Sequence, residues 1–301
     1  MMNFCRSIIP AILLAGMFLT LLPERATAGD LIVNVPSASK TDGRANYFLA
    51  VLRLALEKSE VPFSLVSIDA GRNMTHSRKK VSVTRGILSV VWDGAKSTWD
   101  EGLQPVKIPI YGGINSLRIF LAHGEIRKKL EAAETIDDLR QFSVGFGIGW
   151  AGEEIFKHNG FTTVSAQYDK LFKMLNAGRF DLFSRGVQEA YIEIDEHGNE
   201  NPNIFVDDKV GLYQSSFIYF YVNESDHRLY KALETGLRKA YADGSFKKLF
   251  LTTPEINSAL TRAKINDRTW FKLTNPLLTE EEIETNLELV DTLIPLAIRS
   301  R

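Results

Sequence analysis

The run "SVGFGIGWAGEEIFKHNG" (143–160), followed by "TTVSAQYDKLFKMLNAGRFDLF" (162–183), decides the fold because it alternates short β-rich segments with helical ones. "SVGFG", "TTVSA" and "RFDLF" are typical of short buried strands, whereas "GEEIFKHNG" and "DKLFKMLNAG" have helical spacing and end at glycine. A regular alternation of strand and helix predicts parallel strands joined by crossover helices. We therefore expect an α/β protein.

The same alternation extends in both directions from this run. Upstream we predict strands at 30–35, 63–68 and 86–92 with helices at 45–59 and 75–86, and downstream a helix at 187–197, an aromatic strand at 216–223 and a long amphipathic helix at 227–244. Between "VKIPIYGG" and "SLRIFLA" two extended segments follow one another across a Gly-Gly pair with no helix between them. This break predicts that the chain crosses there from one lobe to a second.

The N-terminus has the pattern of a secretory signal peptide. Arg6 precedes the apolar run "SIIPAILLAGMFLTLL", and an A-x-A site ends at Ala28. The alternative, an uncleaved membrane anchor, needs about 20 apolar residues, which is longer than this run. The only cysteine, Cys5, lies inside the signal, so the mature chain has none for disulfides or thiolate chemistry. We expect a monomeric periplasmic protein with no stable membrane insertion after cleavage.

Charge and motifs exclude several classes of function. The formal net charge is −1, and basic residues are scattered, so the sequence has no footprint for nucleic acid. It contains no H-E-x-x-H or G-x-S-x-G motif, and its five histidines are isolated from one another. We therefore expect no metal, no cofactor and no catalysis, although Glu153, Glu154 or Asp93 would be the acid–base candidates of an enzyme.

"GIGWAG" (147–152) fits the dinucleotide fingerprint G-x-G-x-x-G, with Asp169 roughly 20 residues beyond. Its position in the middle of an exported chain argues against a nicotinamide cofactor. A Gly-rich turn that enters a helix still offers backbone N–H groups and the positive end of the helix dipole to an anion. Gly149, Trp150 and Ala151 are therefore candidate ligand contacts, and a tight turn without a ligand is the alternative.

Further candidates stand at predicted strand ends and at the crossing, because ligands of open α/β sheets bind beyond the carboxyl ends of strands. Trp92 is suited to stack on a ligand and Asp93 to accept its hydrogen bonds, or they close the sheet edge and cap the next helix. Tyr111 lines the cleft or packs the hinge. Arg118 points into the cleft or faces solvent.

Arg185 follows the predicted strand "RFDLF" and precedes the helix at 187–197. A guanidinium at that place is suited to planar, bidentate recognition of a carboxylate or phosphate. The alternative is an internal ion pair with Glu189, one helical turn further on, or with Asp181.

The stretch from Phe142 to Ala190 resembles lobe two of the bacterial family 3 solute-binding proteins, the periplasmic components of amino-acid-type ABC transporters. The matching segments are the "SVGFG…GEE" strand, turn and helix, the "LFKMLNAGRFD" helix and strand, and the returning "SFIYFYVN" strand with its long helix and "ADGS". The resemblance implies a two-lobed type II periplasmic binding fold that clamps a ligand between its lobes. It also implies an inner-membrane ABC permease as partner.

This resemblance divides the chain into a signal peptide (1–28), lobe 1 (29–112), lobe 2 (113–215), a return to lobe 1 (216–264) and a C-terminal tail (265–301). The chain departs from the family where amino acids are held. Glu101 stands near the place of the family's carboxylate-binding arginine, and Ser184-Arg185-Gly186 replaces its ammonium-binding aspartate. We therefore expect an anionic or aromatic ligand at Trp92, Arg185 and the 149–153 turn. A dehydratase-like enzyme or a sensory module for a separate receptor is the alternative.

Overall fold

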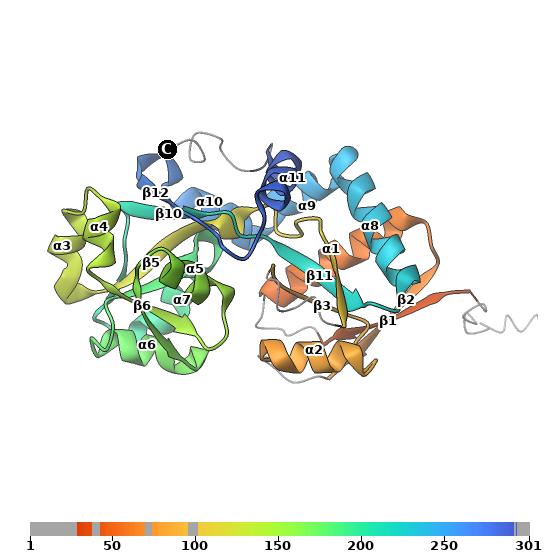
Figure 1. Cartoon of the computed structure of the whole chain (residues 1–301), viewed down its shortest axis with the longest axis horizontal. Coiled ribbons are helices and arrows are strands. Elements are labelled where there is room, and N and C mark those ends of the chain that lie inside the picture. The colour runs from red at the N-terminus through yellow and green to blue at the C-terminus, as the bar shows by residue number, and fades with distance from the viewer. Residues whose placement is uncertain (1–28, 38–42, 70–73, 96–101, 292, 294–301) are drawn as a thin grey trace, which may run out of the picture.

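The computed structural model describes residues 29–37, 43–69, 74–95, 102–291 and 293. The predicted signal peptide and Glu101 lie outside the described residues. Two lobes lie side by side, each a β-sheet flanked by helices, as the alternating pattern predicts (Figure 1). The 206–214 region and the tail beyond 264 contain strands that the pattern did not predict.

Lobe 1 holds a two-stranded sheet, β1-β2, and a three-stranded sheet with the order β3-β11-β4. Its strands are β1 (Leu31–Pro36), β2 (Phe63–Ile68), β3 (Val90–Gly94), β4 (Leu103–Val106) and β11 (Ile218–Asn223). The β1-β2 pair joins the other three strands through the hydrogen bond from Ser89 N to Asn34 O, 2.8 Å long. The helices of this lobe are α1 (Gly43–Ser59), α2 (His76–Thr84), α8 (His227–Ala242) and α9 (Ser245–Thr252).

Lobe 2 is built on a seven-stranded sheet with the order β12-β10-β5-β8-β6-β7, in which β9 also pairs with β5. Its strands are β5 (Leu117–His123), β6 (Ser143–Gly147), β7 (Thr162–Ala166), β8 (Leu182–Gly186), β9 (Ile204–Val206), β10 (Val210–Gln214) and β12 (Thr269–Leu273). The pairings of β6 with β7 and with β8 are parallel, as crossover helices require.

The helices of lobe 2 surround this sheet, and one more helix follows it. They are α3 (Arg127–Glu131), α4 (Ile136–Arg140), α5 (Ala151–His158), α6 (Tyr168–Asn176), α7 (Val187–His197) and α10 (Pro254–Arg262). The last helix, α11 (Glu280–Val290), lies over lobe 1. Short 3₁₀ turns occupy Ile114–Ser116, Gly124–Ile126, Gly198–Glu200 and Ile265–Asp267.

The chain first passes between the lobes at the Gly-Gly pair. Gly112 and Gly113 have φ values of 55° and 73°, a left-handed conformation that favours glycine. A Cβ at Gly112 would also lie 2.8 Å from Cε2 of Phe250. The turn therefore depends on glycine twice, for its conformation and for its contact with α9.

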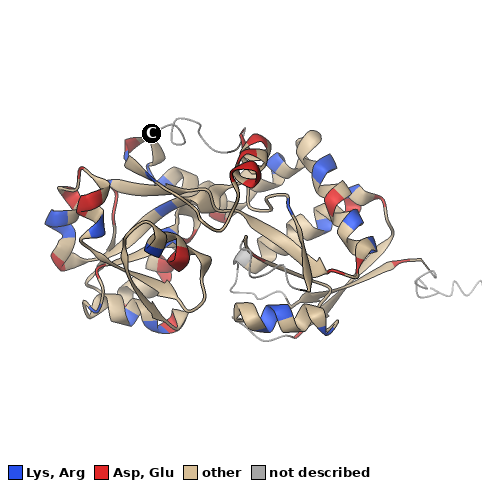
Figure 2. Ribbon diagram, in the orientation of Figure 1, with Lys and Arg blue, Asp and Glu red and all other residues tan. Residues whose placement is uncertain are grey.

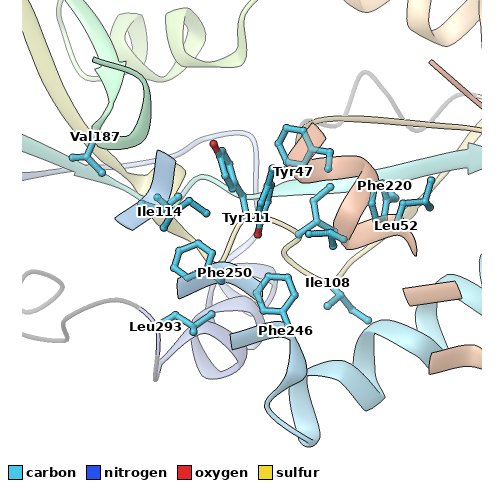
Figure 3. Close-up of a cluster of buried hydrophobic side chains, with 14 of the residues drawn as sticks. Tyr47, Leu52, Ile108, Tyr111, Ile114, Val187, Phe220, Phe246, Phe250 and Leu293 are labelled. Atoms are coloured by element: carbon cyan, nitrogen blue, oxygen red, sulfur yellow. The ribbon is translucent and has the colours of Figure 1, made fainter. Parts of the chain in front are cut away.

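The hydrophobic core continues through this crossing. Tyr111 and Phe250 of lobe 1 lie in the same buried cluster as Ile114 at the crossing and Val187 at the start of α7 (Figure 3). The lobes are thus joined by packed side chains as well as by the backbone. Lysine, arginine and acidic residues are interspersed over both lobes (Figure 2). Within the described ranges, no helix is long and apolar enough to span a bilayer.

Candidate ligand-binding site between the lobes

The lobe 2 side of the site begins at the Gly-rich turn between β6 and α5. Gly149 has φ 77°, and a Cβ at Gly147 would lie 2.2 Å from Cε2 of Trp150. The missing side chain at Gly147 lets the Trp150 indole fold back over the end of β6. In that position its ring lies 6.2 Å from the ring of Phe183, with 18° between the planes. Gly147 and Gly149 therefore allow the Trp150 side chain to take this position.

Arg185 lies behind Trp150, with its guanidinium 4.9 Å from the indole centroid. It is 2% exposed and lies inside β8, paired with Ile119 of β5, rather than after the strand as its sequence position suggests. Its Nε donates to Glu193 Oε2 at 2.5 Å, and its Nη2 forms an ion pair with Glu193 Oε1. The same Nη2 lies 3.3 Å from Glu189 Oε1. The internal ion pair considered for Arg185 therefore exists, with Glu193 as an additional partner.

Electrostatics keep this buried arginine charged. Burial by itself would lower the pKa of Arg185, but the Glu189 and Glu193 carboxylates outweigh burial and raise that pKa. The Tyr168 hydroxyl donates to Glu193 at 2.9 Å and completes the carboxylate's partners. The positive charge behind Trp150 is thus compensated within lobe 2.

Arg118 is 7% exposed, so the prediction that it faces solvent is wrong. Its guanidinium donates to Ser184 O at 2.9 Å and to Asn115 Oδ1 at 3.1 Å, and it lies 3.7 Å from Glu189. Burial lowers the pKa of Arg118 to about 10. It links the crossing at Asn115 to the end of β8, because β5 runs antiparallel beside β8.

The lobe 1 side of the site is aromatic. The Trp92 ring lies 5.3 Å from that of Phe48 on α1, and Phe48 lies 5.0 Å from Tyr111. Tyr111 is 4% exposed and also contacts Tyr47 at 5.0 Å, so it packs the hinge side of the cluster. Trp92 is the half-buried member at the end of β3.

Asp93 beside Trp92 is held by two residues of α2. Its Oδ2 lies 2.8 Å from Lys79 Nζ and 2.8 Å from His76 Nδ1, and its Oδ1 accepts from Gly94 N at 2.8 Å. Burial would raise the pKa of Asp93, but Lys79 and His76 hold it well below its usual range. The negative charge on this wall is therefore also compensated.

The two sides meet where β3 ends and α5 begins. A Cβ at Gly94 would lie 3.8 Å from Cβ of Ala151, and a Cβ at Gly149 would lie 3.6 Å from Cδ2 of His76. The structure thus brings the end of β3 and the start of α2 against the turn that enters α5. Trp92 and Asp93 line one side of this junction, and Trp150 lies on the other with Arg185 behind it.

Several neighbours of these residues were not singled out from the sequence. They are Tyr47, Phe48, His76, Lys79, Tyr168 and Glu193. Two of the contacts have local signals. His76 and Lys79 stand at i and i+3 on a helix that begins after Thr75, and Glu193 stands one turn beyond Glu189 on the same face of α7. The described residues contain no cluster of three or more His, Cys, Asp or Glu suited to a metal ion.

Comparison with known proteins gives a result for structure only. The sequence matches no protein-family model and no curated protein. An ancestral arginine-binding protein bound to arginine aligns with a TM-score of 0.51 and 13% identity, over 73% of this chain and 96% of that one. An amino acid ABC transporter substrate-binding protein from Streptococcus pneumoniae, bound to L-arginine, aligns at 0.51 and 14%, over 77% and 96%.

A histidine kinase sensor domain similar to periplasmic binding proteins aligns at a TM-score of 0.50 and 14% identity, over 73% of this chain and 93% of that one. At identities this low, the alignments show a similar fold, and the ligands of those proteins are not thereby ligands of this chain. The resemblance to the family 3 solute-binding proteins is confirmed at that level. The chain has the two-lobed fold of the periplasmic binding proteins.

Proposed function

We propose that this protein is a periplasmic solute-binding protein that captures one small ligand between its lobes and delivers it to an ABC-type permease. The observation that carries the proposal is the pair of half-buried tryptophans on the two sides of the lobe junction. Trp92 lies on Phe48 in lobe 1, and Trp150 lies on Phe183 in lobe 2. Half-buried rings on rigid backing are suited to stack on a ligand when the lobes close.

The ligand that suits these walls best is a small aromatic molecule without a strong net charge. Arg185 already has carboxylate partners in Glu189 and Glu193, and Asp93 already has Lys79 and His76. An anionic ligand would have to compete with both glutamates for Arg185, at a cost in desolvation. The anionic class expected from the sequence stays in the proposal as the second ligand class.

We also propose that the protein is exported through a cleaved signal peptide and that it is a monomer. These two proposals rest on the sequence pattern of residues 1–28 and on the self-contained core of the two lobes. Trp92, Asp93, Tyr111, Arg118, Gly149, Trp150, Ala151 and Arg185 are the proposed site residues. Tyr111 and Arg118 are buried, so they would act by holding the hinge side of the site in place.

A sensory role is the second candidate, because the fold is also that of a histidine kinase sensor domain. In that role the closed form would bind a separate receptor. A genome neighbourhood with a permease and an ATPase supports transport, whereas one with a receptor kinase supports sensing. Turnover of a bound ligand that is lost on substitution of Asp93, Glu153 or Glu154 would instead identify an enzyme.

A thermal-shift screen of aromatic compounds, small acids, amino acids and sugars tests the proposal. We expect a hit among the aromatic compounds that is lost in Trp150→Ala and Trp92→Ala. Tyr230→Ala, a half-buried aromatic on α8 away from the junction, is the matched control and should keep the shift. A hit that survives both tryptophan substitutions would place the ligand elsewhere and refute the site.

A further inference from the structure

The backbone passes between the two lobes four times. The chain passes from β4 to β5 at Gly112 and Gly113, and returns from β10 to β11 through Ser215 and Ser216. Between α9 and α10 it enters lobe 2 again, and after β12 it crosses to lobe 1 as α11 (Figure 1). We call residues 269–290, which are β12, the crossing segment and α11, the strap.

The strap is fixed firmly to lobe 2 at its start. β12 pairs in parallel with β10 along its full length, from Thr269 to Leu273. The Trp270 ring covers Gly211, where a Cβ would lie 2.6 Å from the ring, and its Nε1 donates to Ile265 O at 2.8 Å. Arg268, 2% exposed just before the strand, donates to Val210 O at 2.8 Å. This end is part of the sheet.

The crossing segment is tied to the second crossing by a buried side chain. Asn275, 6% exposed, donates from Nδ2 to Ser215 O at 2.6 Å and accepts from Leu277 N at 2.9 Å. Two leucines that follow Pro276 pack on opposite lobes. Leu277 contacts the lobe 2 core, and Leu278 contacts the lobe 1 core. The strap therefore changes lobes between these two neighbouring residues, shortly after Asn275.

The far end of the strap is docked on lobe 1. Asn286, 2% exposed, donates from Nδ2 to the Tyr219 hydroxyl of β11 at 2.5 Å, and Val290 is buried in the lobe 1 core. Glu282, which also closes the capping box of α11 with Thr279, pairs with Lys107 at 2.6 Å. The acidic residues of α11 are visible together in Figure 2. Just beyond the end of α11, Leu293 lies in the buried cluster near Phe250 (Figure 3).

From these contacts we infer that the strap limits how far the lobes separate, and that Asn275 is a positioning residue for this limit. Backbone crossings can act as hinges, about which two lobes rotate. The strap is the fourth crossing, and because it is bonded to the second and anchored in both cores, it resists that rotation until Asn275 leaves Ser215 or α11 leaves lobe 1. If the proposed function is correct, the strap also slows exchange of the ligand.

The distance between the lobes can be measured without any ligand. The described residues contain no cysteine, so in a chain with Cys5→Ser a labelled pair at Arg85→Cys and His158→Cys, both exposed and on different lobes, reports the separation by double electron-electron resonance. We expect one narrow distance distribution in the otherwise unaltered full chain. Asn275→Ala and Asn286→Leu, which release the middle and the far end of the strap, should each broaden it toward longer distances.

Asn257→Ala, an exposed asparagine on α10, is the matched control and should leave the distribution narrow. Asn275→Asp separates the two bonds of this side chain, because it keeps the acceptor for Leu277 N and removes the donor to Ser215 O. It should behave like Asn275→Ala. A distribution that stays narrow in folded Asn275→Ala and Asn286→Leu, checked by circular dichroism, overturns the inference.

Ligand exchange provides the second readout. With an aromatic hit from the screen, we expect Asn275→Ala to raise the dissociation rate about fivefold, the effect of one buried hydrogen bond that holds the closed form. An unchanged dissociation rate beside a broadened distance distribution would show that opening does not limit exchange, and would overturn that step alone. If no ligand of any class binds, the proposed function fails, and the distance measurement still decides the strap.

Discussion

Arg185 is one of the largest side chains that the described residues bury completely. At the scale of single residues, its contribution to stability depends on its carboxylate partners, Glu189 and Glu193. Removing one partner of a buried ion pair costs about 3–5 kcal/mol, because the other charge is left without compensation. Arg185→Met should therefore lower the free energy of unfolding by about 3–5 kcal/mol, since Glu189 and Glu193 lose their common partner. Urea unfolding at pH 7 measures this.

A second variant separates the pair from the site. In Arg185→Met/Glu193→Leu both sides of the closest pair are apolar, and replacing a whole buried pair is often nearly neutral. We expect it to recover at least half of the stability lost in Arg185→Met. If Arg185→Met unfolds at the same urea concentration as the unaltered chain, the guanidinium is not held by these carboxylates.

Asp93 makes stability depend on pH. Its pKa in the folded chain lies below the value of about 3.9 in an unfolded chain. Its contribution is therefore fully present above about pH 4 and is lost as the pH falls from there through the folded pKa. Asp93→Asn should be less stable by about 1–3 kcal/mol at pH 7, and the difference should shrink below pH 4. Unfolding measured from pH 7 to pH 2 checks this, and a difference independent of pH contradicts it.

The sequence predicted which residues lie together at the lobe junction better than it predicted their partners. Trp92, Asp93, Trp150 and Ala151 are at or beside one junction, because strand ends and the helix start converge there in any open α/β sheet. The burial of Arg118 could not be predicted, because alternation along β5 fails in a strand covered on both faces.

At the scale of elements, α1 and α8 show how closely two helices of lobe 1 pack. A Cβ at Gly236 would lie 1.7 Å from the carbonyl oxygen of Ala55. Gly236→Ala must therefore push the helices apart, and we expect it to lower the free energy of unfolding by about 1–3 kcal/mol despite the better helix propensity of alanine. Thermal unfolding measures the loss.

Arg238→Ala on the exposed face of α8 is the control for that substitution and should change stability by less than about 0.5 kcal/mol. An unchanged melting temperature in Gly236→Ala would contradict the close contact between α1 and α8.

Elements with strong local signals were predictable, and those that depend on distant partners were not. The α7 helix and the β11 strand lie within one or two residues of the segments predicted for them, 187–197 and 216–223. By contrast, "IFVDDKVGLYQ" (204–214) has two aspartates and a glycine that are typical of a loop, yet it holds β9 and β10. Gly211 belongs in β10 because the Trp270 ring of β12 covers it, a contact across the sheet that no local pattern contains.

At the scale of the whole molecule, the proposed function requires two lobes that close on a ligand, and four backbone crossings join these lobes. The alternation of strands and helices predicts the lobes, because each βα unit folds locally. The strap was not predictable, since it depends on β12 reaching β10 and on α11 reaching β11. It makes the relative position of the lobes depend on the tail as well as on the hinge.

Native mass spectrometry of the full-length protein, released gently from the periplasmic extract of its own host, shows whether the protein captures a ligand. We predict one small molecule bound per chain, lost on mild activation and absent from the Trp92→Ala/Trp150→Ala variant prepared in the same way. A protein that carries no small molecule under any condition, or a variant that carries the same molecule to the same extent, would contradict ligand capture between the lobes.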